Sequence, residues 1–204
     1  MTLPRARISW RRLRAAAVLS GAALGVACGH SAPTEFLTLQ PVPPQVRSPS
    51  APGDPVRVAA VHLPPWLDRL EVTRPTEGAA VVVEDFERWS APVGDLALAA
   101  LTEDLADRLA GVTVLPARAI APPATRDVTV DLTSLTRRGT SLELDGAATV
   151  TDARTGALIL SLPISLRTPA SAGAPGEARA LDELMGELAD RLAPALRAGS
   201  VAGR

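Results

Sequence analysis

Hydrophobic and polar residues alternate along several stretches of the chain, with the period of two that half-buried β-strands show. This alternation and a richness in β-branched residues predict strands at residues 36–39, 56–63, 70–74, 79–85, 128–133, 142–152 and 158–166. The last strand is expected to carry one apolar face, made of Leu158, Leu160, Leu162, Ile164 and Leu166. Pro163 falls on the other face of this strand and favours an edge position or a bulge, because proline donates no backbone hydrogen bond.

Two other segments repeat leucine with the spacing of an amphipathic helix. The first stripe consists of Leu98, Leu101, Leu105 and Leu109, and the second of Leu181, Leu184, Leu188, Leu192 and Leu196. We expect each stripe to pack on a sheet. The solvent side of the first helix is expected to carry Glu103, Asp104, Asp107 and Arg108. Pro194 is expected to end or kink the second helix.

The order of strands, helix, strands, helix predicts an α/β fold, an α-β sandwich. Arg137 and Arg138 beside Gly139 are typical of a hairpin tip, and residues 151–156 of a hairpin loop. Such connections imply a mixed, substantially antiparallel sheet that packs with two long amphipathic helices, the first of which serves as a crossover. The Pro-rich segment 40–55 is expected to be an extended loop.

The amino-terminal segment has a different pattern. Five arginines lie in the first fourteen residues, and the uncharged apolar stretch 15–27 follows them and ends at Cys28. A basic segment, a short apolar segment and small residues before a cleavage site indicate a secretory signal. The apolar stretch is too short to span a membrane, which takes about 20 residues.

The place of the only cysteine resembles a bacterial lipoprotein signal, in which the cysteine is acylated and becomes the mature terminus. We therefore expect a lipoprotein signal peptide at residues 1–27, with Cys28 as the lipidation site. An ordinary signal peptide cut after Ala27 is the alternative. The pair Arg11-Arg12 leaves twin-arginine export open as the route.

Composition narrows the chemistry further. Hydrophobic residues make up 47% of the chain and charged residues 21%, which is enough apolar content for a folded core. All 21 basic residues are arginine, so a P-loop lysine is absent. One cysteine and two histidines exclude an internal disulfide and a cysteine-rich zinc site. The formal net charge of −1 argues against nucleic-acid binding. From Cys28 onward the net charge is −6, which argues against binding of anionic headgroups by charge.

Candidate catalytic groups are few. No phosphate-binding glycine motif and no Gly-x-Ser-x-Gly nucleophile motif is present. His62 is the candidate general base of the ordered region, and a secreted or lipid-anchored hydrolase that uses it is an alternative function. Glu84, Asp85 and Glu87 are interpreted as a solvated strand end that leads into a turn. We expect no enzyme activity, no cofactor and no metal.

The segment from Val61 to Arg74 stands out, because Trp66 and Leu67 form a large apolar pair directly after a turn. A second tryptophan, Trp89, is expected in another short polar-flanked turn. Both tryptophans are expected to pack the sheet ends or to form a partner surface, since Trp is favoured as an interface anchor. In the same segment, Asp68 and Arg69 can bond locally to backbone groups.

These residues resemble the signature of the PqiC/YmbA-type lipoproteins, also called the ABC-type transport auxiliary lipoprotein component. The matching residues are Leu63, Pro64, Trp66, Leu67, Asp68, Arg69, Val72 and Arg74. Arg88 and Trp89 open a segment similar to the family's Arg-Trp-Ala-Glu-Pro, from which Ser90 and Ala91 depart. Phe36 to Leu39 resembles the aromatic strand behind the lipidated cysteine.

The resemblance implies a non-enzymatic, lipid-anchored periplasmic subunit that works with an ABC permease, an ATPase and an Mce-domain substrate-binding protein. Such systems are thought to move phospholipid or other hydrophobic molecules between membranes. The implied organisation is a tether at residues 28–35, a domain at 36–197 that includes the Pro-rich loop, and a disordered tail at 198–204. Gly29 after the cysteine favours the outer membrane, by the sorting habit of enteric bacteria.

Five residues would define either the partner contact or the turns that shape it, namely Trp66, Arg69, Arg74, Arg88 and Trp89. A lipoprotein that carries lipid in its own apolar pocket is a further alternative. The sequence leaves open whether the chain forms a homo-oligomer.

Overall fold

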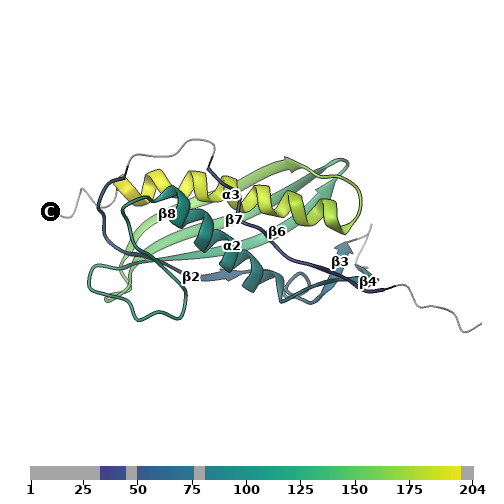
Figure 1. Ribbon diagram of the computed structural model, residues 1–204, viewed down its shortest axis with the longest axis horizontal. Coiled ribbons are helices and arrows are strands. Elements are labelled where there is room, and N and C mark those ends of the chain that lie inside the picture. Colours follow the sequence, from purple (N-terminus) through teal and green to yellow (C-terminus); the bar gives the residue numbers. More distant parts are fainter. Residues whose placement is uncertain (1–32, 45–49, 76–80, 199–204) are drawn as a thin grey trace, which may run out of the picture. The chain divides into compact units, whose positions relative to one another are not determined.

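The computed structural model describes residues 33–44, 50–75 and 81–198. Within these ranges the chain forms two helices and a set of strands, and the strands build two sheets (Figure 1). The strands are β1 (Glu35–Leu37), β2 (Val56–His62), β3 (Glu71–Pro75), β4 (Val81–Trp89), β5 (Val114–Leu115), β6 (Arg126–Arg138), β7 (Ser141–Asp152) and β8 (Leu158–Pro169). The helices are α2 (Val93–Arg108) and α3 (Ala174–Ala198). The predicted α/β class is confirmed.

The larger sheet has five strands in the order β5-β2-β6-β7-β8. β2 runs parallel to β5 and β6. α2 carries the chain back before β5, and the loop 116–125 returns it before β6, whereas β6, β7 and β8 are antiparallel hairpin neighbours. β8 is an edge strand, as Pro163 predicts. A register shift opposite Val150 and Thr151 interrupts its alternation, so Leu158 is 64% exposed instead of lying on the apolar face.

The smaller sheet has the order β1-β4-β3, and the prediction of a single sheet was wrong. The turn after β2 redirects the chain, so β1, β3 and β4 pair with one another. β4 is also longer than expected. Trp89, expected in a turn, is its last residue, and its backbone N–H donates to the Leu70 carbonyl at 2.7 Å.

Both helices lie side by side over one face of the five-stranded sheet (Figure 1). Every leucine of the α3 stripe is buried, as are Leu101, Leu105 and Leu109 of the first stripe. Burial of these side chains is the main stabilising term of the domain. α3 continues past Pro194 to Ala198, so Pro194 does not end it. No helix in the described ranges is long and apolar enough to cross a bilayer.

Asp104 and Arg108 were expected on the solvent side of α2, but both are buried. The reason is the start of the Pro-rich segment, where residues 40–42 contact both helices. Asp104 Oδ1 accepts the backbone N–H of Val42 at 2.7 Å, and Arg108 Nη1 donates to the Val42 carbonyl at 2.9 Å. Arg108 also donates through Nε to Asp190 of α3 at 2.6 Å. Burial raises the pKa of Asp104 to about 6.

The same segment contacts α3 at Asp182, the residue directly after Leu181 of the apolar stripe. Asp182 Oδ1 accepts the backbone N–H of Gln40 at 2.8 Å, and burial raises the pKa of Asp182 to about 6. Val42 packs against Gly186, where a Cβ would lie 2.9 Å from the Val42 Cβ. Residues 40–42 therefore form a strap over the two helices. The strap covers Asp104 and Arg108, which helical periodicity alone places on the solvent side.

Candidate functional site

The family-like residues form a tight connection between β2 and β3, which we call the signature loop (residues 63–70). It begins with a turn in which the backbone N–H groups of Leu67 and Asp68 donate to the Pro64 carbonyl at 2.8 and 3.2 Å. Pro65 occupies the second position of this turn, where the fixed φ of proline is favoured. The turn buries Leu67, which is 8% exposed, and Leu63 packs partly buried against the core.

Asp68 caps the α2 helix. Its Oδ1 accepts the backbone N–H of Gly94 at 2.9 Å, and Pro92 at the N-cap position supplies no side-chain cap of its own. A carboxylate at a helix N-terminus satisfies an unpaired N–H and interacts favourably with the helix dipole. A Cβ at Gly94 would lie 3.1 Å from Asp68 Oδ1 and 3.2 Å from the Val61 carbonyl oxygen, so a side chain there would crowd this contact.

Arg74 on β3 is the centre of an ion-pair cluster. Its Nε donates to Glu177 Oε1 at 3.0 Å, its Nη1 donates to Glu84, and its Nη2 lies 3.8 Å from Glu87 Oε2. Arg137 of β6 adds a second cation, 3.3 Å from Glu177 Oε1. Since Glu177 belongs to the first turn of α3, the cluster joins the smaller sheet to the rest of the domain.

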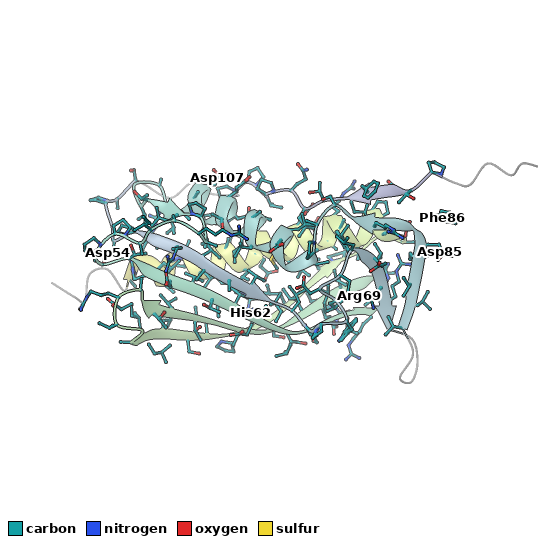
Figure 2. All side chains as sticks on the ribbon, turned by 90° about the horizontal axis from the view of Figure 1, so that it is seen from below. Asp54, His62, Arg69, Asp85, Phe86 and Asp107 are labelled. Carbon is teal, nitrogen blue, oxygen red and sulfur yellow. The ribbon has the colours of Figure 1, made fainter. Side chains whose placement is uncertain are left out.

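The carboxylates of β4 were interpreted as a solvated strand end before a turn, and that interpretation was wrong for two of them. Glu71 pairs with Arg88 while Thr73 pairs with Val83, so residues 84–87 bulge out of the regular register. This irregularity brings Glu84 and Glu87 to Arg74, whereas Asp85 is exposed (Figure 2).

The two tryptophans have different surroundings. Trp89 is 7% exposed and belongs to the core, where it stands beside Leu37 in the parallel register of β1 and β4. Trp66 is half-buried, and its carbonyl accepts the Thr73 hydroxyl at 3.0 Å. Trp89 therefore packs the end of the smaller sheet, while Trp66 remains partly exposed.

Arg69 and Arg88 are the exposed cations of this region. Arg69 lies on the signature loop (Figure 2), and its Nε is 3.4 Å from Glu71 Oε2. An exposed pair at this distance adds little stability. Arg88 is exposed on β4, and within the described ranges its side chain has no hydrogen bond or ion pair. Both guanidinium groups are thus available to a partner.

A cleft of about 270 Å³ opens beside the signature loop. Leu67, Leu135 and Leu142 line its apolar part, and Arg74, Arg137 and Glu177 line its charged part. Such a mixture suits an apolar side chain flanked by polar backbone groups. Sequence reasoning missed Arg137 and Glu177 as members of this site, and the only signal was an acidic residue in the first turn of α3.

His62 lies exposed at the end of β2 (Figure 2). In the part of the chain that the structure describes, no serine or carboxylate is hydrogen-bonded to it, and no group of His, Cys, Asp and Glu is arranged to hold a metal ion. Cys28, the signal peptide 1–27 and most of the tether 28–35 lie outside the described residues, as do residues 199–204 of the tail.

The fold is similar to two solved structures. A crystal structure described as an uncharacterized protein is 16% identical, with a TM-score of 0.66, and the match covers 81% of this chain and 99% of that one. A crystal structure of a DUF330 protein from Xanthomonas campestris is 12% identical, with a TM-score of 0.57, and the match covers 79% and 93% of the two chains. At these identities the likeness concerns the fold. No curated protein sequence matches the chain significantly.

The described part of the chain thus forms two sheets joined by the signature loop, with a pair of helices over the larger sheet. The family model described as the ABC-type transport auxiliary lipoprotein component matches residues 37–193. The chain therefore belongs to this family, whose description gives its members a supporting role in ABC-type transport.

Proposed function

We propose that the protein is a lipid-anchored periplasmic accessory subunit of an Mce-type ABC transporter, which moves phospholipid or other hydrophobic molecules between membranes. Its partners are an Mce-domain substrate-binding protein and the permease and ATPase of the same system. It acts by docking and bridging, not by catalysis. The anchor is acylated Cys28 in the outer membrane, followed by the tether 28–35 and the domain 36–197.

The way in which the signature loop is built supports a docking role. Asp68 caps α2, and Arg74 joins the smaller sheet to α3. Leu67 is buried, so these three side chains have structural roles. The same loop leaves Trp66 partly exposed and Arg69 exposed at the surface. A rigid loop that presents a tryptophan and an arginine has the residue types that dominate binding energy at protein interfaces.

The adjoining cleft suits a protein segment better than a small substrate. Its volume of about 270 Å³ is below the roughly 300–1,000 Å³ of pockets for drug-sized ligands, and its charged groups are already paired with one another. A partner side chain inserted at Leu67, with its backbone near Arg137, would bury apolar surface without breaking the ion pairs. We place the partner contact at Trp66, Arg69 and this cleft.

The partner contact can be tested by co-purification of the transporter complex from membranes. Arg69→Glu and Trp66→Ala are expected to weaken recovery of the Mce-domain protein, because Arg69 is exposed and Trp66 is partly exposed on the signature loop. Arg118→Glu is the matched control, since Arg118 is an exposed arginine in the loop between β5 and β6. Equal recovery with all three variants would contradict the proposed contact.

The anchor has its own test. Mass spectrometry of the mature protein is expected to find an acylated Cys28 at the amino terminus, and Cys28→Ser is expected to release the protein from the membrane fraction. An unmodified Cys28, or an intact signal peptide, would contradict lipidation. A gene neighbourhood without Mce-domain, permease and ATPase genes would count against the proposed system.

The alternative functions have weaker support. A hydrolase requires groups around His62 that the described residues do not bring to it, and loss of function in a folded His62→Ala variant would nevertheless favour it over docking. A lipid carrier requires an apolar cavity larger than a drug-sized pocket, because a two-chain phospholipid is itself larger. The most apolar of the clefts described, beside Leu160 and Leu196, holds about 240 Å³.

A further inference from the structure

Exposed apolar side chains gather on the smaller sheet. In the described ranges nine large apolar residues are exposed, and six of these belong to β1, β4 or the residue before β3. They are Phe36, Leu70, Val81, Val82, Val83 and Phe86. We call this set the small-sheet patch. A gathering of this kind on one small element marks a contact surface, whereas single exposed apolar residues do not.

The patch is open on both faces of its strand. Val81, Val82 and Val83 are 42%, 47% and 44% exposed, and successive side chains of a strand point to opposite faces. Side chains on both faces of this end of β4 therefore reach solvent, although Arg74, the register partner of Val82, ties the smaller sheet to Glu177 of α3. Phe86, 49% exposed, lies on the same strand (Figure 2), and Phe36 of the neighbouring strand is 68% exposed. A rigid partner surface would cover only one face of this strand end, whereas the lipid of a bilayer can surround both faces.

The chain itself ties this patch to the proposed anchor. Phe36 follows Cys28 by eight residues, and a fully extended chain of that length spans at most about 29 Å. β1 pairs with β4 in register, so a limit on the distance from the anchor to Phe36 also limits the distance to Phe86. An acylated terminus held in the membrane would therefore keep Phe36 within about 29 Å of the anchor, close enough for the patch to reach the membrane surface.

We propose that the small-sheet patch inserts shallowly into the surface of the bilayer that holds the lipid anchor, and so orients the domain on the membrane. This inference rests on the acylation of Cys28 in the proposed function. The favoured surface is zwitterionic, because Glu35 and Asp85, both exposed, flank Phe36 and Phe86 and would be repelled by anionic headgroups. Arg88, opposite Phe36 in the register, lies at the height of the phosphate groups.

The test uses the acylated mature protein reconstituted in phosphatidylcholine and phosphatidylethanolamine vesicles. Because Cys28 is the only cysteine and its thiol carries the acyl chain, a cysteine introduced as Val82→Cys or Phe86→Cys is the sole site for an environment-sensitive fluorophore. Ile120→Cys is the matched control, since Ile120 is 95% exposed and lies in the loop before β6. We expect a blue shift and quenching by acyl-chain quenchers at positions 82 and 86 but not at 120, and a smaller blue shift when phosphatidylglycerol is added.

Several results would overturn the inference. Labels at 82 and 86 that stay as exposed to water as the label at 120 would show that the patch does not enter the membrane. If the blue shift grows with protein density and acyl-chain quenchers have no effect, the patch binds a second copy of the protein. If the blue shift appears only when the Mce-domain protein is present, the patch binds that partner. An unmodified Cys28 in mass spectrometry would refute the anchor itself, which separates failure of the proposed function from failure of this inference.

Discussion

Asp68 Oδ1 accepts the backbone N–H of Gly94 at 2.9 Å, so that the carboxylate of one loop caps a helix that begins 25 residues later in the chain. The contact fixes the signature loop against α2 at the end of β2. It explains why this loop needs an aspartate at this position and a glycine opposite it. Arg74, six residues further on, fixes the other end of the segment to α3.

Replacement of the helix cap should destabilise the domain. We expect Asp68→Ala to lower the free energy of unfolding by about 1 kcal/mol, the usual effect of losing an N-cap acceptor. Asp68→Asn should lose less, because its amide oxygen still accepts the Gly94 N–H. Urea unfolding measures both. Asp95→Ala is the control, since Asp95 is exposed in the same first turn without this hydrogen bond, and equal losses at 68 and 95 would contradict the capping role.

Removal of the charge at Arg74 should be more damaging than removal of a surface arginine. Arg74→Gln leaves Glu84, Glu87 and Glu177 close together without their shared cation. We expect a loss of about 1.5–3 kcal/mol in unfolding free energy, the range for hydrogen bonds to charged groups. In Arg191→Gln, which removes an exposed pair with Glu187 on α3, the loss should be about 0.3–0.5 kcal/mol. Urea unfolding measures both losses. Similar unfolding midpoints for the two variants would argue against an ion-pair cluster that stabilises the fold.

The strap over the helices should make stability depend on pH. Burial raises the pKa of Asp104 to about 6 from an ordinary 3.8, so the folded state binds this proton more tightly than the unfolded state. Stability from this group is therefore fully present below about pH 4 and is lost as the pH rises to about 6. Asp182, whose pKa is also raised by burial to about 6, acts in the same direction.

The Asp104→Asn variant isolates this effect. Its amide oxygen still accepts the Val42 N–H, but it cannot ionise, so its stability relative to the native protein should increase between pH 4 and pH 7. Urea unfolding at several pH values measures the difference. Asp131→Asn, at an exposed position of β6, is the control for the substitution itself. A difference for Asp104→Asn that stays constant over this range would contradict the raised pKa.

A side chain at Gly146 should disrupt the centre of the larger sheet. Gly146 of β7 faces the register shift in β6, and a Cβ there would lie 2.3 Å from the Asp131 carbonyl oxygen and 2.9 Å from the Leu132 Cα. Backbone atoms cannot move away cheaply, so Gly146→Ala should cost about 1–3 kcal/mol. Gly139→Asn is the control, because its hairpin tip is open and Asn tolerates a φ of +59°. Thermal unfolding should separate the two, and a native-like Gly146→Ala would refute the close approach.

The local pattern of hydrophobic, glycine and proline residues was sufficient to predict most helices and strands of the fold. The leucine stripes, the hairpin tip at Gly139 and the edge position of Pro163 follow from side-chain periodicity and backbone chemistry, which act between near neighbours in sequence. The same information could not divide the strands between two sheets. That division depends on which backbone groups pair after the turn at Pro64, and such pairing is a long-range choice.

The same limit of sequence-based prediction applies to the candidate site. The amino-acid sequence alone determined the signature residues, the family resemblance and the expected lipid anchor at Cys28, because these depend on residue identity and spacing. Only the tertiary structure decided that Asp68 caps α2, that Glu84 and Glu177 meet at Arg74, and that Asp104 is buried. The physical reason is that each of these contacts joins segments that are distant in the chain, and their burial and charge pairing exist only after those segments pack together.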